Sequence, residues 1–249
     1  MKRIGAQLYT VRQKLSSSDE IKTTLAAIKS IGYDSVQLFG SIDLASSHAK
    51  TAKEVGLTIL GVLTNLSDCE ANAKKWFDLC KEYNIKDIGV STTFSECQDT
   101  KSYIKRVNLF AKEANDKGFT FSYHNHGHEF IKLDSGEIPM FSFLEGFETE
   151  TVNFMPDTYW LQDGGYDVRY FLEKARNRVR ILHLKDMKRI EQGHTFTEVG
   201  NGNLYFEGII KTAIDCGINE FVVEQDICEG NPLDSLKISY DHIKNILEG

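Results

Sequence analysis

"DIGVSTTFSECQDTKSYIKRVNLFAKEANDKGFTFSYHN" (residues 87–125) decides the fold, because it places one helical segment between two short apolar runs. The runs at 87–92 and 120–125 have the length and the aliphatic and aromatic content of strands. Residues 100–118 have apolar side chains at helical spacing and end at Gly118, a common helix stop. A strand, a helix and a second strand in this order predict two parallel strands joined by a helical crossover.

The same alternation continues along the whole chain. Strands are predicted at 4–10, 35–40, 58–64, 87–92, 120–125, 152–157, 179–186 and 221–226. Helices are predicted at 19–32, 44–56, 71–84, 100–118, 138–147, 167–175, 206–217 and 233–249. Eight strand–helix units in 249 residues predict an α/β fold of the (β/α)8 TIM barrel type, as a single domain over residues 1–249. An open doubly wound sheet is the alternative, but no GxGxxG fingerprint follows the first strand.

Composition excludes several classes of protein. The net charge of −7 argues against broad nucleic-acid binding, which needs a basic surface. No apolar run has the length needed to cross a membrane, and the first 15 residues lack the apolar core of a signal peptide. Five cysteines without a CxxC pair are expected to be free thiols in a reducing compartment. The sequence therefore predicts a cytoplasmic protein.

Polar side chains lie at the carboxyl ends of the last four predicted barrel strands, where barrels of this kind place their functional groups. An ionisable side chain in a strand is costly unless it is paired or bound to a metal. Two imidazoles and two carboxylates suit Mn²⁺, Zn²⁺, Fe²⁺ or Co²⁺ better than Ca²⁺. The pattern predicts one divalent metal ion, held by His124, Asp157, His183 and Glu224. Taken singly, each residue also has a plain structural explanation, such as a salt bridge or a buried core histidine.

Three further residues are candidates for contacts with a substrate. Tyr9 and Gln37 lie at the ends of the first two strands, where they would either hydrogen-bond sugar hydroxyls or fill the core. Trp160 would either form the floor of a sugar pocket through its aromatic ring or pack in the core.

Two candidates lie next to the predicted metal ligands. His126 shares a strand face with His124, so it would either orient that ligand or contact a sugar hydroxyl. Lys185 shares a face with His183, and would either bind an oxyanion or form a salt bridge with Asp186 or Glu224. The run of histidines from 124 to 128 is also compatible with a solvated loop.

Six motifs occur in an order that resembles one known family. They are "QLYTVR", "YHNHGHEF", "PDTYW", "HLKD", "VGNG" and "VEQD", and they extend from Gln7 to Asp226. Together they resemble the sugar phosphate isomerase/epimerase family of xylose isomerase-like TIM barrels. The resemblance implies one divalent metal and matches Asp157, His183 and Glu224 to its ligands. The chain departs from the family at His124, because related epimerases often have a glutamate there, as in "ENH".

The departure bears on the chemistry that the resemblance implies. In related epimerases two glutamates flank the substrate, one removing a proton beside a carbonyl and the other returning it to the opposite face. With a histidine in place of one of them, Glu224 is the expected base, and Glu129, His126 and Lys185 are candidates for the second acid or base. The predicted function is a metal-dependent isomerase or epimerase of a sugar, keto-sugar or sugar phosphate that acts through a metal-stabilised enediolate. The alternative is a lyase or dehydratase that acts on a keto-sugar or inosose.

Two other functions fit the sequence less well. A DNA-repair endonuclease of the same superfamily would need more metal ligands and a basic groove. The chain has only seven histidines and a net charge of −7, and both numbers argue against this function. A sugar-binding module without catalysis would need no base such as Glu224. The predicted partner is therefore a small-molecule sugar or sugar phosphate, with no nucleic acid and no membrane. Assembly into a homo-oligomer stays open.

Overall fold

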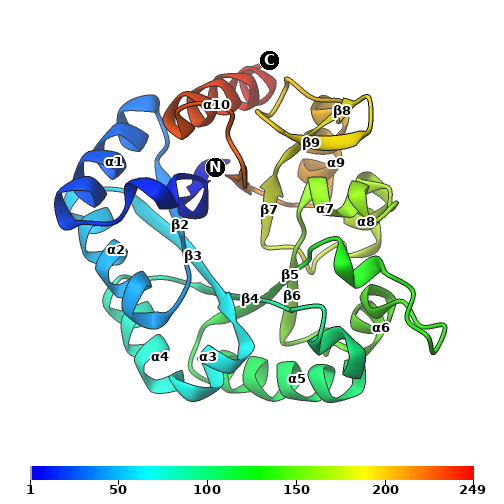
Figure 1. Ribbon diagram of the computed structural model, residues 1–249. Helices are drawn as coiled ribbons and strands as arrows, with labels where there is room; N and C mark the ends of the chain where they lie inside the picture. Colours follow the sequence, from blue (N-terminus) through cyan, green and yellow to red (C-terminus); the bar gives the residue numbers. More distant parts are fainter. Residues whose placement is uncertain (1) are drawn as a thin grey trace.

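The barrel predicted from the alternating pattern is confirmed by the computed structural model, which describes residues 2–249 (Figure 1). Eight parallel strands form one sheet in the order β6-β5-β4-β3-β2-β1-β10-β7. Two isolated parallel bridges, Phe154 to Val179 and Asp157 to His183, connect the β6 region to the β7 region. They nearly close the ring. The barrel strands are β1 (Arg3–Gln7), β2 (Ser35–Phe39), β3 (Thr58–Asn65), β4 (Asp87–Ser91), β5 (Thr120–His124), β6 (Val152–Met155), β7 (Ile181–Leu184) and β10 (Glu220–Val223).

Helices surround the strands on the outside of the ring, as Figure 1 shows. The eight that correspond to the predicted helices are α1 (Ser18–Ile31), α2 (Ile42–Val55), α4 (Ala73–Glu82), α5 (Thr100–Asp116), α6 (Pro139–Gly146), α8 (Val168–Lys174), α9 (Phe206–Asp215) and α10 (Pro232–Glu248). Their buried faces pack on the outer face of the sheet; in α5, for example, Val107, Phe110 and Ala111 are buried beside β5. The main core therefore lies between the strands and the helices.

The interior of the barrel is filled below the level of the polar strand ends. Leu60, Met155, Ile181 and Val222 form a separate buried apolar cluster. Glycines on neighbouring strands make room for it: a Cβ atom added to Gly89 would lie 2.9 Å from the Met155 Cε. This packed layer forms a floor on which the polar side chains at the carboxyl ends rest.

Two predicted elements differ from the structure near the start of the chain. The first strand, predicted to reach residue 10, ends at Gln7, whose side chain accepts a hydrogen bond from the Tyr9 backbone N–H and starts the 3-10 helix η1 (Leu8–Lys14). The helix predicted over 71–84 is interrupted at Asn72, which separates α4 from the short helix α3 (Leu66–Ala71). Two more 3-10 turns are η2 (Glu96–Asp99) and η3 (His128–Phe130).

A further difference lies after β7, where the predicted strand 179–186 was too long. The strand ends at Leu184, and residue 186 begins an antiparallel hairpin of β8 (Asp186–Ile190) and β9 (Gly193–Thr197). The Asp186 carboxylate accepts hydrogen bonds from the backbone N–H groups of Met187, Gly200, Gly202 and Leu204. A Cβ atom at Gly202 would lie 2.3 Å from the Asp186 Oδ1. The "HLKD" and "VGNG" motifs therefore meet in one loop, and Asp186 is not the partner of Lys185.

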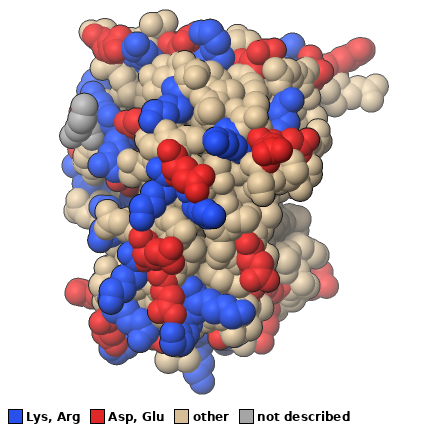
Figure 2. All heavy atoms as spheres, turned by 90° about the vertical axis from the view of Figure 1, so that its left-hand side faces the viewer, with Lys and Arg blue, Asp and Glu red and all other residues tan. Residues whose placement is uncertain are grey.

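Surface charge on the face that includes α1 and α2 is mixed, since Figure 2 shows basic and acidic side chains interspersed over it. The five cysteines are free, as expected. Within residues 2–249, every helix is too short or too polar to pass through a lipid bilayer.

One buried carboxylate lies at the opposite end of the barrel from the predicted metal ligands. Asp87, the first residue of β4, accepts hydrogen bonds from the Thr120 and Ser122 hydroxyls at 2.7 Å, while its Oδ2 has no partner. Burial raises the pKa of Asp87 to about 6, and the two hydroxyls only partly oppose the shift. Because the folded protein favours the protonated form, this group contributes stability below about pH 4 that is lost as the pH rises to about 6.

We expect Asp87→Asn to increase the free energy of unfolding at pH 7.5 by about 1–2 kcal/mol, because the neutral amide avoids the cost of a buried charge. The gain over the wild type should be near zero at pH 4, grow to about pH 6 and then stay constant. Urea unfolding of both proteins between pH 4 and pH 8 measures the difference. A gain that does not change with pH would show that Asp87 is ionised throughout this range.

Candidate metal centre

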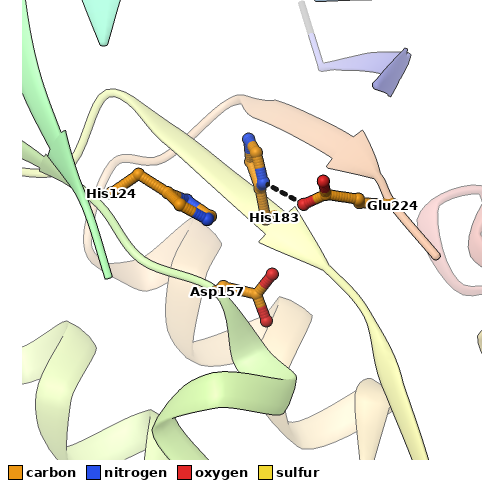
Figure 3. A group of neighbouring side chains, drawn as sticks. All are labelled: His124, Asp157, His183 and Glu224. Atoms are coloured by element: carbon orange, nitrogen blue, oxygen red, sulfur yellow. Dashed lines mark hydrogen bonds and ion pairs between the residues drawn. The ribbon is translucent and has the colours of Figure 1, made fainter. Parts of the chain in front are cut away.

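The four predicted metal ligands converge at the carboxyl end of the barrel. His124 ends β5, and His183 lies in β7. Asp157 follows the end of β6 after one residue, and Glu224 follows the end of β10 directly. One donor atom from each lies within 4.8 Å of the others, and all four residues are buried. Figure 3 shows the side chains directed toward a common centre. The structure thus brings together the complete predicted set.

In two of these residues, His124 and Asp157, one polar side-chain atom is already hydrogen-bonded to the backbone. The His124 Nδ1 lies 3.1 Å from the carbonyl oxygen of Met155, which only accepts, so Nδ1 carries the proton and Nε2 keeps a lone pair. The Asp157 Oδ1 accepts from the backbone N–H groups of Tyr159 and Trp160 as the N-cap of α7 (Thr158–Asp163). The Asp157 Oδ2 is buried without a hydrogen-bond partner. Each residue therefore has one free donor atom for the centre.

The other two ligands face each other. The His183 Nδ1 lies 2.9 Å from the Glu224 Oε2, the contact drawn as a dashed line in Figure 3. Burial lowers the pKa of His124 well below its usual range, aided by His183, so this imidazole is neutral. Burial alone would raise the pKa of Glu224, but Lys185 and His183 outweigh it and hold the pKa well below its usual range. Imidazole nitrogens, a carboxylate and the orphaned Asp157 Oδ2 fit a single divalent cation.

A buried ammonium group lies beside this centre. The Lys185 Nζ is 2.9 Å from the Asp226 Oδ1, 3.4 Å from the Asp157 Oδ2 and 3.5 Å from the Glu224 Oε2. Burial would lower the pKa of Lys185, but the three carboxylates outweigh it and raise the pKa well above its usual range. Lys185 is therefore a fixed positive charge next to the candidate metal ligands.

Two cavities meet at His126, which lines both. The first has a volume of about 670 Å³ and reaches His124 and Glu224, with Tyr9 on its wall. The second has a volume of about 650 Å³ and contains Trp160. Of the predicted substrate-contacting residues, Tyr9 and His126 thus line the cavity that reaches the centre, and Trp160 lines the neighbouring one. A sugar ring in the first cavity would contact His124 and Glu224 directly.

A family model described as the xylose isomerase-like TIM barrel matches residues 25–246. The chain belongs to this family. Inosose dehydratase of Mesomycoplasma hyopneumoniae (strain 7448) is 26% identical over 172 residues, which cover 60% of this chain and 55% of that protein. Inosose dehydratase of Clostridium perfringens (strain 13 / Type A) is 27% identical over 155 residues, which cover 55% of this chain and 51% of that protein. The match thus spans about half the length of these curated relatives.

Several solved structures superimpose on nearly the whole chain. A sugar phosphate isomerase/epimerase from Parabacteroides distasonis ATCC 8503 has a TM-score of 0.82 at 21% identity, covering 98% of both chains. A family protein from Mycobacterium smegmatis in complex with magnesium has a TM-score of 0.75 at 14% identity, covering 99% and 97%. The IOLI protein with a bound zinc atom has a TM-score of 0.73 at 11% identity, covering 99% and 98%. At these identities the likeness establishes the fold.

Gln37 lies away from both cavities of this barrel. It is fully buried on β2, where its Oε1 is 2.7 Å from both the Gln7 Nε2 and the His183 Nε2. Its Nε2 faces the Met155 sulfur at 3.1 Å. The structure therefore places Gln37 against the candidate metal ligand His183, and its predicted contact with the substrate stays a prediction.

Glu129 is also held away from the centre, although it lies near His126 in the sequence. Its carboxylate is fully buried and accepts from the Tyr123 hydroxyl at 2.7 Å, from the Thr92 hydroxyl and from the His126 backbone N–H. Donor atoms of His126, His128 and Glu129 do lie within 4.8 Å of one another. Because Glu129 already accepts from three donors, we assign no second metal ion to this group.

Two residues of the site are not among the sequence-based candidates. Asp226 contacts Lys185 and lines the first cavity, and Phe196 of β9 lines the same cavity and stacks on Tyr159. Asp226 follows Glu224 by two residues in the "VEQD" motif, and that spacing is the signal that would have found it. Phe196 belongs to the β8–β9 hairpin, which the periodic pattern of apolar residues in the sequence does not predict.

Proposed function

We propose that this chain is a divalent-metal-dependent enzyme that removes the proton next to the carbonyl group of a sugar or keto-sugar. The observation that carries the proposal is the convergence of four donor side chains beside a cavity large enough for a sugar. A divalent cation bound there would act as a Lewis acid that polarises the substrate carbonyl. The magnesium and zinc in the two related structures support a metal here, with Mn²⁺, Zn²⁺, Co²⁺ and Fe²⁺ as the ions to test.

Glu224 is the proposed base. It is ionised, it lines the first cavity, and it lies on the wall that also carries the metal ligands. Glu224 takes the proton from the carbon beside the carbonyl, and the electron pair of the broken C–H bond forms the double bond of an enediolate. Lys185 keeps its own proton, and its positive charge next to Asp157 and Glu224 favours the negative charge that develops on the enediolate.

The isomerase or epimerase outcome depends on where the proton returns. Glu224 can return it to the former carbonyl carbon on the same face, while the hydroxyl proton moves from one oxygen of the enediolate to the other, which gives an isomerase. An epimerase needs a second acid on the opposite face, and His126 is the candidate that lines the cavity. Burial lowers the pKa of His126 to about 4, so it is neutral at physiological pH and would have to take up a proton before it could act as this acid. Glu129 is the weaker candidate, because its oxygens already accept hydrogen bonds.

A lyase or dehydratase is the second candidate, favoured by the replacement of the usual strand-5 glutamate by His124. In this reaction Glu224 takes the proton, the C–H electron pair forms a C=C bond, and the substituent on the next carbon leaves with its bonding pair. Glu224 then gives the same proton to the departing oxygen, so a single acid–base residue suffices and the elimination is syn. The inosose dehydratases among the relatives support this outcome.

Proton NMR in D₂O with a panel of sugars, keto-sugars and inososes, with Mn²⁺ added for turnover and removed before recording, tests the proposal. We expect the signal of the proton beside the carbonyl to disappear for at least one substrate. An unchanged product mass apart from deuterium would indicate an isomerase or epimerase, and a loss of about 18 Da would indicate a dehydratase. A product in which that proton stays on its original carbon would contradict the proposed base chemistry.

A further inference from the structure

A chain of buried hydrogen bonds links the start of the first helical turn to the candidate metal ligand His183. It runs from the Tyr9 backbone through Gln7 and Gln37, which are register neighbours on β1 and β2. We propose that this relay fixes the proton of His183 on Nε2 and thereby presents a bare Nδ1 to the metal. Gln7 and Gln37 are then positioning residues. The inference rests on the proposed metal site and goes beyond it.

The first step starts from a group whose role is unambiguous. A backbone N–H only donates, and that of Tyr9 lies 3.2 Å from the Gln7 side-chain oxygen, Oε1. This contact fixes the orientation of the Gln7 amide, so its nitrogen, Nε2, faces Gln37. An amide nitrogen also only donates, so the Gln37 atom 2.7 Å away has to be the acceptor, Oε1.

The second step uses the same donor and acceptor rules to place the proton on the His183 imidazole. The Gln37 Oε1 also lies 2.7 Å from the His183 Nε2. Since an amide oxygen only accepts, Nε2 carries a proton, so a divalent cation between His183 and Glu224 would take the place of a proton on Nδ1 and bind the lone pair of that nitrogen. That nitrogen is the one directed at Glu224 and at the common centre in Figure 3. The remaining Gln37 N–H points at the Met155 sulfur, a weak acceptor that suits this orientation.

Burial makes the arrangement hard to reverse. Gln37 and His183 have no exposed surface and are not among the residues that line the two cavities, so water does not take the place of a lost partner between them. Rotating one amide would place two donors or two acceptors face to face, and each unsatisfied buried group costs about 1–3 kcal/mol. The relay therefore holds a proton on Nε2, while the Glu224 carboxylate competes for a proton on Nδ1 only until a cation lies between them.

The alternative tautomer would oppose metal binding. With the proton on Nδ1, His183 would donate to the Glu224 Oε2 at 2.9 Å. That hydrogen bond would occupy the lone-pair position of His183 and one oxygen of Glu224 at the same time. Loss of the Gln37 acceptor is therefore expected to weaken metal binding 10- to 100-fold, the usual effect of removing a partner that orients a ligand.

The test compares Gln37→Leu, which removes the acceptor, with Gln37→Glu, which keeps an acceptor oxygen at the same reach. Affinity for Zn²⁺ and Mn²⁺ is measured by competition with a chelator, and thermal unfolding reports whether each variant folds. We expect a 10- to 100-fold weaker affinity for Gln37→Leu and recovery to within about threefold for Gln37→Glu. Equal affinities of the wild type and Gln37→Leu would overturn the relay and leave the metal site intact.

A second measurement needs no variant. Long-range ¹⁵N–¹H NMR of the zinc-loaded wild type shows which nitrogen of His183 is protonated. A protonated Nε2 with zinc on Nδ1 is the expected result, and zinc on Nε2 would overturn the relay even if Gln37→Leu failed to fold. If the wild type binds no divalent ion, the proposed function fails and the inference fails with it.

Discussion

Glu224→Gln is expected to lower turnover by about 10³- to 10⁴-fold while the divalent cation still binds. The amide keeps an oxygen that can face the centre, but it cannot accept a proton from carbon. A loss of this size corresponds to about 4–5.5 kcal/mol of transition-state stabilisation. Turnover of the substrate found by the D₂O screen, together with metal content after dialysis, measures both parts of the expectation.

Glu220→Gln is the matched control. Glu220 is the first residue of β10, so it lies at the end of the barrel opposite to Glu224. It should keep turnover within about twofold, as expected for a partly exposed residue far from the chemistry. If Glu224→Gln turned over as fast as this control, the base would have to be another residue.

His183→Ala is expected to remove the metal. It takes away one of the four donors. It also removes the contact of His183 with Gln37 at 2.7 Å and its contact with Glu224 at 2.9 Å. Lys185 lies 3.5 Å from Glu224, so its ammonium can then neutralise that carboxylate in place of a metal. We expect affinity for Mn²⁺ and Zn²⁺ to fall by at least about 100-fold, since a direct ligand matters more than its outer partner. Elemental analysis after dialysis measures the bound metal.

His242→Ala serves as the control for His183→Ala. His242 lies on α10, outside the ring of strands, and its loss removes the same kind of side chain from the protein. This variant should retain the wild-type metal content. If His183→Ala also retained one metal per chain after dialysis, the ion would be bound somewhere other than the proposed centre.

The main elements follow from local chemistry and were therefore predictable. Helix α1 begins at the Ser17 cap and ends at Gly32, where φ is +127°, and both signals are visible in the sequence. The first strand was predicted too long because "QLYT" has the composition of a strand. Its actual end depends on the hydrogen bond between the Gln7 side chain and the Tyr9 N–H, which short-range propensity does not reveal.

The candidate ligands were predictable for a different reason. Parallel barrel strands end at one rim, so polar residues at the ends of β5, β6, β7 and β10 have to meet there. The direction of the side chains was not predictable in the same way. Glu129 is close to His126 in sequence, but η3 turns it toward Tyr123. Asp157 was treated as a strand end, whereas it also caps α7, and that second role leaves only its Oδ2 for a metal.

The most direct test of the metal centre is anomalous diffraction from crystals grown with Mn²⁺. The account predicts one strong anomalous peak per chain, in contact with the His124 Nε2, the Asp157 Oδ2, the His183 Nδ1 and the Glu224 carboxylate, while Lys185 remains beside Asp226. A crystal in which Mn²⁺ binds only at other positions, with these four side chains turned away from one another, would contradict it.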